Sequence, residues 1–212
     1  MKKRNKIIIL NLLGSYFLLL GITAIIRSIY RQTPSQILYA CYIGTILIGI
    51  GILTKRSFII LSQVYILTIP LLIWDIDFIH WLIFNRPLWG ITDYFFFDFS
   101  AILDKFVTLQ HLYTIPISIY AVKLIGIKRK DAWKWSFIQI VAIFIAVITF
   151  SPQELNVNCI FYSCININYG LPYNLVWFLI SFSMISITAL FLNYFLWHKR
   201  IKIYRQGNFR KH

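Results

Sequence analysis

The stretch SFIILSQVYILTIPLLIW, residues 57–74, decides the fold class, because it contains no charged side chain. A helix of about 20 apolar residues, at 1.5 Å per residue, crosses the hydrocarbon core of a bilayer. This stretch therefore predicts a transmembrane helix. The composition agrees, since 59% of the 212 residues are hydrophobic and only 13% are charged, against about 25% charged in soluble domains. Soluble enzymes, disordered chains and disulfide-rich secreted miniproteins are excluded.

Other apolar stretches add further predicted spans. They cover residues 7–26, 37–54, 108–125, 135–151 and 174–197. One more stretch, 78–99, is rich in aromatic residues, and it is interrupted by Asn85, Arg86, Pro87, Gly90 and Asp93. We expect it to be a re-entrant or interfacial segment. The predicted fold class is all-α: an integral membrane bundle of six transmembrane helices within residues 1–198, followed by a basic tail, 199–212.

The basic residues fall mainly on one side of this six-span topology. With the N-terminus in the cytoplasm, 17 of the 21 Lys and Arg residues lie inside, and the remaining four lie outside, namely Arg27, Arg31, Arg86 and Lys105. Cytoplasmic loops of membrane proteins carry such an excess of Lys and Arg. We therefore predict a multi-pass protein of the cell membrane with both termini cytoplasmic. We predict no nucleic-acid partner, because no soluble portion is large enough to bind one.

The predicted third span ends in WDIDFIHW, residues 74–81. If the helix continues, Asp77 and His80 share a face, whereas Asp75 lies roughly opposite Asp77. Carboxylate and imidazole groups that lie close together can bind a divalent cation. The alternative is that the aspartates simply lie in the lipid headgroup layer, within an aromatic belt. We assign no metal ligand and no cofactor from this motif alone.

The predicted fourth span begins TLQHLYTIPIS, residues 108–118. Its spacing places His111, Thr114 and Ser118 on one face of a helix. A polar stripe on an apolar helix should face other helices, because its hydroxyl groups need hydrogen-bond partners. His111 is the main candidate for proton transfer, since imidazole titrates near neutral pH. The alternative is a role in an interhelical hydrogen bond.

The predicted outer loop, residues 152–173, alternates asparagine with other residues at Asn156 and Asn158 and again at Asn166 and Asn168. A period of two predicts short extended segments, and we expect a hairpin that folds over the bundle. An asparagine that reaches the bundle can orient a histidine or stabilise an oxyanion. The alternative is that it caps a helix or closes a turn.

The chain has three cysteines. Cys159 and Cys164 share the outer loop, where an oxidising environment would allow them to form a disulfide or leave them as free thiols. Their spacing is not that of a redox carrier. Cys41 lies near the outer end of the second span. It is either a nucleophile for acyl transfer, if a base lies near it, or a buried inert thiol.

The order of features from His111 to the C-terminus resembles a known family. A span that opens with His111 is followed by a short basic loop, a span, an asparagine-containing outer loop and a last span entered through Pro172. This order is similar to the YwaF-like integral membrane proteins of bacteria, whose eukaryotic relatives include transmembrane acyltransferases. The resemblance implies that His111 matches the family's histidine and that Asn156 or Asn158 matches its loop asparagine.

The first functional hypothesis is a membrane-embedded enzyme that acts on a lipid or acyl substrate at the outer face. In it, His111 is the general acid or base, an aspartate orients it or holds a metal, and a loop asparagine donates a hydrogen bond. The residues predicted to take part in catalysis are His111, Asp75, Asp77 and Asn158. Those predicted to bind substrate are Thr114, Ser118, His80 and Asn156.

Two alternatives belong to other classes of protein. The first is a non-catalytic partner or assembly subunit, indicated by the aromatic run Tyr94–Phe97, which is a large patch to leave uncovered outside lipid. The second is a small transporter, which needs a polar path through the bundle. The lipid bilayer is a predicted partner under every hypothesis. The sequence leaves open whether the chain is an enzyme.

Overall fold

The computed structural model describes residues 3–96, 102–127, 129, 131–165 and 170–208, the side chains of 196–208 excepted. The described residues form helices and connecting loops, with no strand among them. The helices are α1 (Lys3–Tyr30), α2 (Ala40–Leu53), α3 (Ser57–Phe84), α4 (Asp93–Phe96), α5 (Ile102–Thr108), α6 (Gln110–Ile125), α7 (Ala132–Phe150) and α8 (Tyr173–Asn208). Short 3-10 turns are η1 (Pro34–Leu38), η2 (Gln153–Leu155) and η3 (Val157–Cys159). The all-helical prediction is thus confirmed for the described chain.

Four helices are long and apolar enough to cross a membrane. They are α1, α3, α7 and the part of α8 from Tyr173 to Phe195. The chain is therefore a membrane protein. Helices α2 and α6 are shorter, with 14 and 16 residues, and at 1.5 Å per residue they measure about 21 and about 24 Å. They cover most of the stretches 37–54 and 108–125 that we expected to span the membrane.

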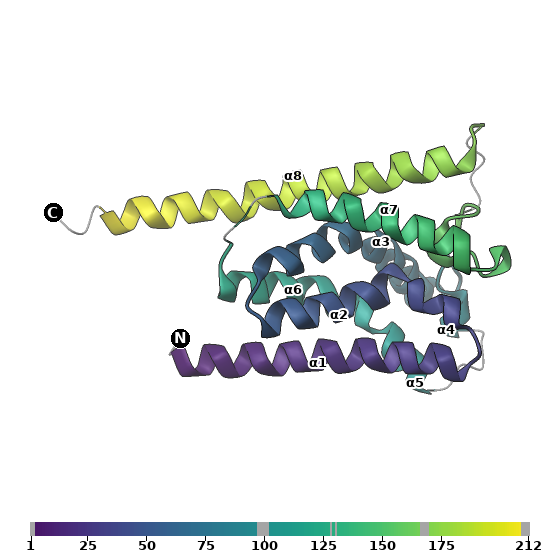
Figure 1. Ribbon diagram of the computed structural model, residues 1–212, viewed down its shortest axis with the longest axis horizontal. Coiled ribbons are helices and arrows are strands. Elements are labelled where there is room, and N and C mark those ends of the chain that lie inside the picture. The colour runs from purple at the N-terminus through teal and green to yellow at the C-terminus, as the bar shows by residue number, and fades with distance from the viewer. Residues whose placement is uncertain (1–2, 97–101, 128, 130, 166–169, 209–212) are drawn as a thin grey trace.

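The long helices lie side by side in an elongated bundle (Figure 1). Helix α1 begins and helix α8 ends at one end of the bundle, which we call the basic end because the turn Lys55–Arg56 also lies there. The opposite end, which we call the cap end, holds α4, α5 and the loop between α7 and α8. Helices α1, α2 and α3 therefore pass between the two ends in alternating directions.

Helix α2 packs closely between α1 and α3 because glycines line its two faces. A Cβ atom at Gly49 would lie 2.7 Å from the backbone nitrogen of Leu18 and 3.0 Å from the backbone oxygen of Gly14. These contacts bring the backbones of α1 and α2 together, as small residues do in membrane proteins. On the other face, Gly44 and Gly51 lie against side chains of α3. A larger side chain at Gly49 would push α1 and α2 apart.

Helix α3 is the central helix, and buried polar side chains join it to its neighbours. The amides of Gln63 and Gln139 exchange two hydrogen bonds, of 2.8 and 2.9 Å, between α3 and α7. The hydroxyl of Tyr65 donates to Oδ1 of Asn193 on α8 at 2.9 Å. Within an apolar medium such polar groups must pair with one another, so these bonds fix which helices are neighbours.

Two local predictions need correction. Residues 78–84, which we expected to belong to the interfacial segment, form the last turns of α3, where the loop after the helix satisfies the carboxylate of Asp77. The helix ends at Phe84, and the residue that follows, Asn85, has a left-handed backbone (φ 52°). The expected hairpin in loop 152–173 is wrong for the described part of that loop, since Asn156, Asn158 and Cys159 have positive φ angles and turn the chain. Asn166 and Asn168 lie outside the described residues.

Candidate functional site

Asp77 holds the loop that follows α3. Its side chain is buried, with 0% of the residue exposed. Its two carboxylate oxygens accept hydrogen bonds from the backbone N–H groups of Leu88 (3.0 Å), Trp89 (2.7 Å) and Thr92 (2.9 Å), and from the Thr92 hydroxyl (2.8 Å). Four donors are enough to replace the hydration of a buried carboxylate. Asp77 therefore stabilises the loop, and its oxygens are occupied.

The other two polar residues at the end of α3 differ from Asp77. His80 Nδ1 lies 2.9 Å from the backbone oxygen of Arg86, so it also contacts the loop after α3. This agrees with the prediction that Asp77 and His80 share a face. Asp75 is half-buried, and its buried Oδ1 atom has no hydrogen-bond partner. Asp75 is thus free of the structural role that Asp77 has.

An aromatic cluster covers the cap-end half of α3. The rings of Trp74 and Phe78 stack at 4.9 Å, and those of Trp81 and Phe96 stack at 4.0 Å. Phe95 contacts Phe78 edge-on at 5.1 Å. Part of the aromatic run that we considered as a docking patch therefore packs on α3 within this chain, while Phe97 lies outside the described residues.

Helix α6 presents a buried polar face at the cap end of the bundle. Gln110, Thr114 and Ser118 recur every four residues, and each is at most 1% exposed. The predicted stripe is confirmed for Thr114 and Ser118, but Gln110 rather than His111 completes the fully buried face. Sequence analysis missed Gln110, although its spacing from Thr114 and Ser118 was available. His111 lies one residue further round the helix and is half-buried.

Several polar atoms of α6 are buried without a partner. Neither ring nitrogen of His111 makes a hydrogen bond, nor do Nε2 of Gln110 and Oγ of Ser118. The His111 ring meets the ring of Trp74 edge-on at 4.7 Å. Oε1 of Gln110 accepts a 2.8 Å hydrogen bond from the hydroxyl of Thr45 on α2. Buried polar atoms usually have partners in proteins, so this group is the part of the molecule best suited to bind a ligand.

The asparagines of the loop after α7 have structural partners. Oδ1 of Asn158 accepts a hydrogen bond from the backbone N–H of Ala40 (2.9 Å), and its Nδ2 donates to the backbone oxygen of Leu38 (2.8 Å). Asn156 bonds within its own loop, where Oδ1 accepts from Phe161 N (3.0 Å) and Nδ2 donates to the backbone oxygen of Tyr162 (2.9 Å). Both residues thus cap a helix or close a turn, the alternative that we considered for them.

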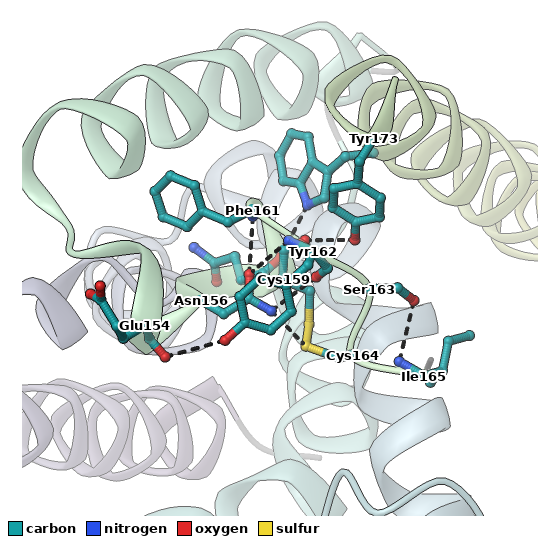
Figure 2. Close-up of a disulfide and its surroundings, with 11 residues drawn as sticks. Glu154, Asn156, Cys159, Phe161, Tyr162, Ser163, Cys164, Ile165 and Tyr173 are labelled. Carbon is teal, nitrogen blue, oxygen red and sulfur yellow. Dashed lines mark hydrogen bonds between the residues drawn. A yellow bond between two sulfur atoms is a disulfide. The ribbon is translucent and has the colours of Figure 1, made fainter. Parts of the chain in front are cut away.

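A disulfide joins Cys159 and Cys164 in this loop, as Figure 2 shows. Figure 2 also shows Tyr173 at the start of α8, whose hydroxyl donates to the backbone oxygen of Cys159 at 2.8 Å. The disulfide closes a short ring within the loop, and the bond from Tyr173 attaches that ring to α8. Cys41 is a free cysteine on α2.

A charged cluster that sequence analysis missed lies where α1 and α5 meet. Arg27 in the last turn of α1 and Arg31, which directly follows the helix, both form ion pairs with the buried carboxylate of Asp104 on α5. Arg27 Nη1 also donates to the hydroxyl of Tyr42 on α2 at 3.3 Å. The sequence signal was available, because two of the four basic residues on the predicted outer side are Arg27 and Arg31.

The structure does not join the four predicted catalytic residues by hydrogen bonds. The oxygens of Asp77 accept from the loop after α3, and the amide of Asn158 bonds to the start of α2. The ring of His111 makes no hydrogen bond to Asp77 or to Asn158. Asp75 and His111 remain as unpartnered polar groups at the same end of the bundle. Among the described residues, no three His, Cys, Asp or Glu side chains are grouped to hold a metal ion.

Comparison with known proteins gives no relative. No family model, curated protein or solved structure matches this chain. The function must therefore be inferred from the molecule itself.

Proposed function

We propose that the chain crosses the membrane six times, with the basic end in the cytoplasm and the cap end outside. Three observations support this topology. The turn Lys55–Arg56 and the starts of α1 and α7 concentrate basic residues at one end, as cytoplasmic loops do. The opposite end carries the disulfide of Cys159 and Cys164, and disulfides persist in extracytoplasmic environments. The 3-10 turn η1 directly precedes the short helix α2, and helix α5 directly precedes the short helix α6.

Thiol labelling tests this topology. In the Cys41→Ala background, intact cells are reduced and then treated with a membrane-impermeant maleimide. We expect Cys159 and Cys164 to be labelled in intact cells. The matched control is a protein with Lys55→Cys as its single cysteine, which we expect to be labelled only after the cells are opened. Labelling of Lys55→Cys in intact cells would contradict the proposed orientation.

We further propose that the cap end binds a lipid or acyl substrate at His111. The observation that carries this proposal is the pair of unpartnered ring nitrogens of His111, next in sequence to the unpartnered Nε2 of Gln110. A neutral imidazole can take the proton from an attacking hydroxyl group and return it to the leaving group. An amide N–H such as that of Gln110 can donate to the carbonyl oxygen as negative charge develops there. Together these groups fit acyl transfer.

Acyl transfer in vesicles tests this function. Vesicles that contain the full chain receive a phospholipid with a fluorescent acyl chain as donor and a long-chain alcohol as acceptor, and the products are separated by chromatography. We expect His111→Ala to abolish the transfer. Tyr120→Phe is the control on the same helix, since Tyr120 is exposed and belongs to no predicted site, and it should retain transfer. Equal transfer by the wild type and His111→Ala, or none in the wild type, would contradict the proposal.

A role as a non-catalytic assembly subunit is the second candidate. It is favoured by the satisfied hydrogen bonds of Asp77 and Asn158, which make the cap end a fixed surface. Exposed apolar side chains at this end include Leu88 and Trp89. Cross-linking in native membranes separates the two candidates. A stable protein partner, with unchanged yield for His111→Ala, would favour the subunit.

A further inference from the structure

The cluster of Arg27, Arg31 and Asp104 has an excess of positive charge. Two guanidinium groups form ion pairs with one carboxylate. Lys105 follows directly on α5, and its ammonium group lies 5.5 Å from the centre of the Phe95 ring. No second carboxylate pairs with these cations among the residues that the structure describes. The cluster is therefore net positive, although the outer side has few basic residues.

The two arginines differ in how far they are exposed to the surroundings. The side chain of Arg27 is 17% exposed and that of Arg31 is 42% exposed, whereas that of Asp104 is 6% exposed. Arg27 also uses Nη1 to donate to Tyr42, so Arg27 is largely occupied. Arg31 contacts Asp104 through Nη2. A guanidinium group has five N–H donors in a planar fork, so Arg31 keeps donors for a further anion.

Apolar side chains on both helices flank the cluster and place it at the edge of the lipid. On α1, Ile26 and Ile29 are 60% and 58% exposed. On α5, Ile102 and Phe106 are 88% and 51% exposed. Exposed apolar side chains of a membrane protein face lipid, and arginines near a helix end reach toward the headgroup layer. The anion available at the edge of the lipid is the phosphate of a phospholipid headgroup.

We propose that Arg31, supported by Arg27, binds the phosphate of a phospholipid in the outer leaflet. Arginine suits this role, because its fork donates two parallel hydrogen bonds to phosphate oxygens. Asp104 holds both arginines in place and leaves the site net positive. Free phosphate carries the same oxygens, and competition with inorganic phosphate distinguishes it from a phospholipid.

One face of α2 links this phosphate site to the proposed acyl site. Tyr42, which accepts from Arg27, and Thr45, which donates to Gln110, lie three positions apart on α2, and residues at that spacing share a helix face. Gln110 directly precedes His111. Buried hydrogen bonds on this face of α2 thus connect the residue that holds Arg27 with the residue that precedes His111. This link rests on the proposed function, whereas the binding of phosphate does not.

Lipid binding to the purified full chain tests the proposal without any turnover. The protein in detergent micelles without other phospholipid is titrated with a fluorescent phospholipid, and the bound lipid is measured by energy transfer from tryptophan. We expect Arg31→Gln to weaken binding about fivefold, the effect of about one basic residue at a membrane surface. Arg31→Lys, which keeps the charge but not the fork, should lie between Arg31→Gln and the wild type.

The matched control is Arg86→Gln, which removes another exposed cation of the cap end and should bind as the wild type does. Inorganic phosphate in about tenfold excess over the lipid would displace most of the lipid if the two bound equally well. We expect no displacement. Equal binding by Arg31→Gln and the wild type would overturn the proposal, and so would displacement by inorganic phosphate. Loss of acyl transfer in His111→Ala with unchanged lipid binding would show that the two proposals stand separately.

Discussion

The loops of the cap end and helix α6 both contain buried polar side chains, but they use these side chains differently. Where side chains hold the loops, they have partners, as Asp77 has in the loop after α3 and Asn158 has at the start of α2. On α6, the ring of His111, Nε2 of Gln110 and Oγ of Ser118 have none. Residue type alone does not separate a structural residue from a ligand-binding one, whereas a count of hydrogen-bond partners does.

The largest expected effect is on Asp77. Asp77→Ala removes the acceptor of three backbone N–H groups in a buried site, and we expect it to lower the free energy of unfolding by about 3 kcal/mol or more. Unfolding in mixed detergent micelles measures this change. Asp75→Asn is the matched control, because Oδ1 of Asp75 has no partner, and it should change stability much less. Equal losses in both variants would remove the difference between the two regions.

Asn158 should show the next largest effect. Asn158→Ala leaves the N–H of Ala40 and the carbonyl of Leu38 without their partner, which should cost about 2 kcal/mol of stability. Asn158→Asp should recover part of the loss, since it keeps an acceptor for Ala40. Thermal unfolding of the two variants, measured side by side, gives the comparison. A stable Asn158→Ala protein without acyl transfer would instead assign Asn158 to the chemistry.

His111 should behave in the opposite way to Asp77. Because its ring makes no hydrogen bond within the chain, His111→Leu should leave the free energy of unfolding unchanged or raise it by up to about 1 kcal/mol, while acyl transfer is lost. Both properties are measured on one preparation in vesicles. A loss of stability as large as that of Asp77→Ala would identify His111 as a structural residue.

The smallest effect is expected for Ser118. Ser118→Ala removes a buried hydroxyl group that has no partner, so stability should change by less than about 0.5 kcal/mol. Thr114→Val is the matched comparison on the same face of α6, since the hydroxyl of Thr114 donates to the backbone oxygen of Gln110 at 2.7 Å. Thr114→Val should therefore lose about 1 kcal/mol more stability than Ser118→Ala, measured from their unfolding curves. A large loss for Ser118→Ala would reveal a partner in the membrane.

The sequence predicts the helices well and the partners of polar side chains poorly. Apolar length defined the positions of α1, α3, α7 and α8, because crossing a bilayer demands it. The stripe of Thr114 and Ser118 followed from helical spacing. The rotation of α6, which buries Gln110 further than His111, depends on the helices around it and has no local signal.

The roles of Asp77 and Asn158 also depend on distant contacts. Asp77 bonds to residues 88–92, and Asn158 bonds to residues 38–40, far earlier in the chain. The end of α3 was predicted too early because Asp75 and Asp77 look like the limit of an apolar span. A charged residue can lie inside a helix when a loop folds back to satisfy it, and only the folded chain shows that loop.

An experimental density map of the full chain in a lipid nanodisc tests the ligand-binding role of α6 most directly. We predict a lipid or acyl oxygen within about 2.6–3.2 Å of a ring nitrogen of His111. A His111 ring surrounded only by apolar side chains of the chain itself would contradict this role. In that case, the polar face of α6 would join the loops of the cap end as part of the structure.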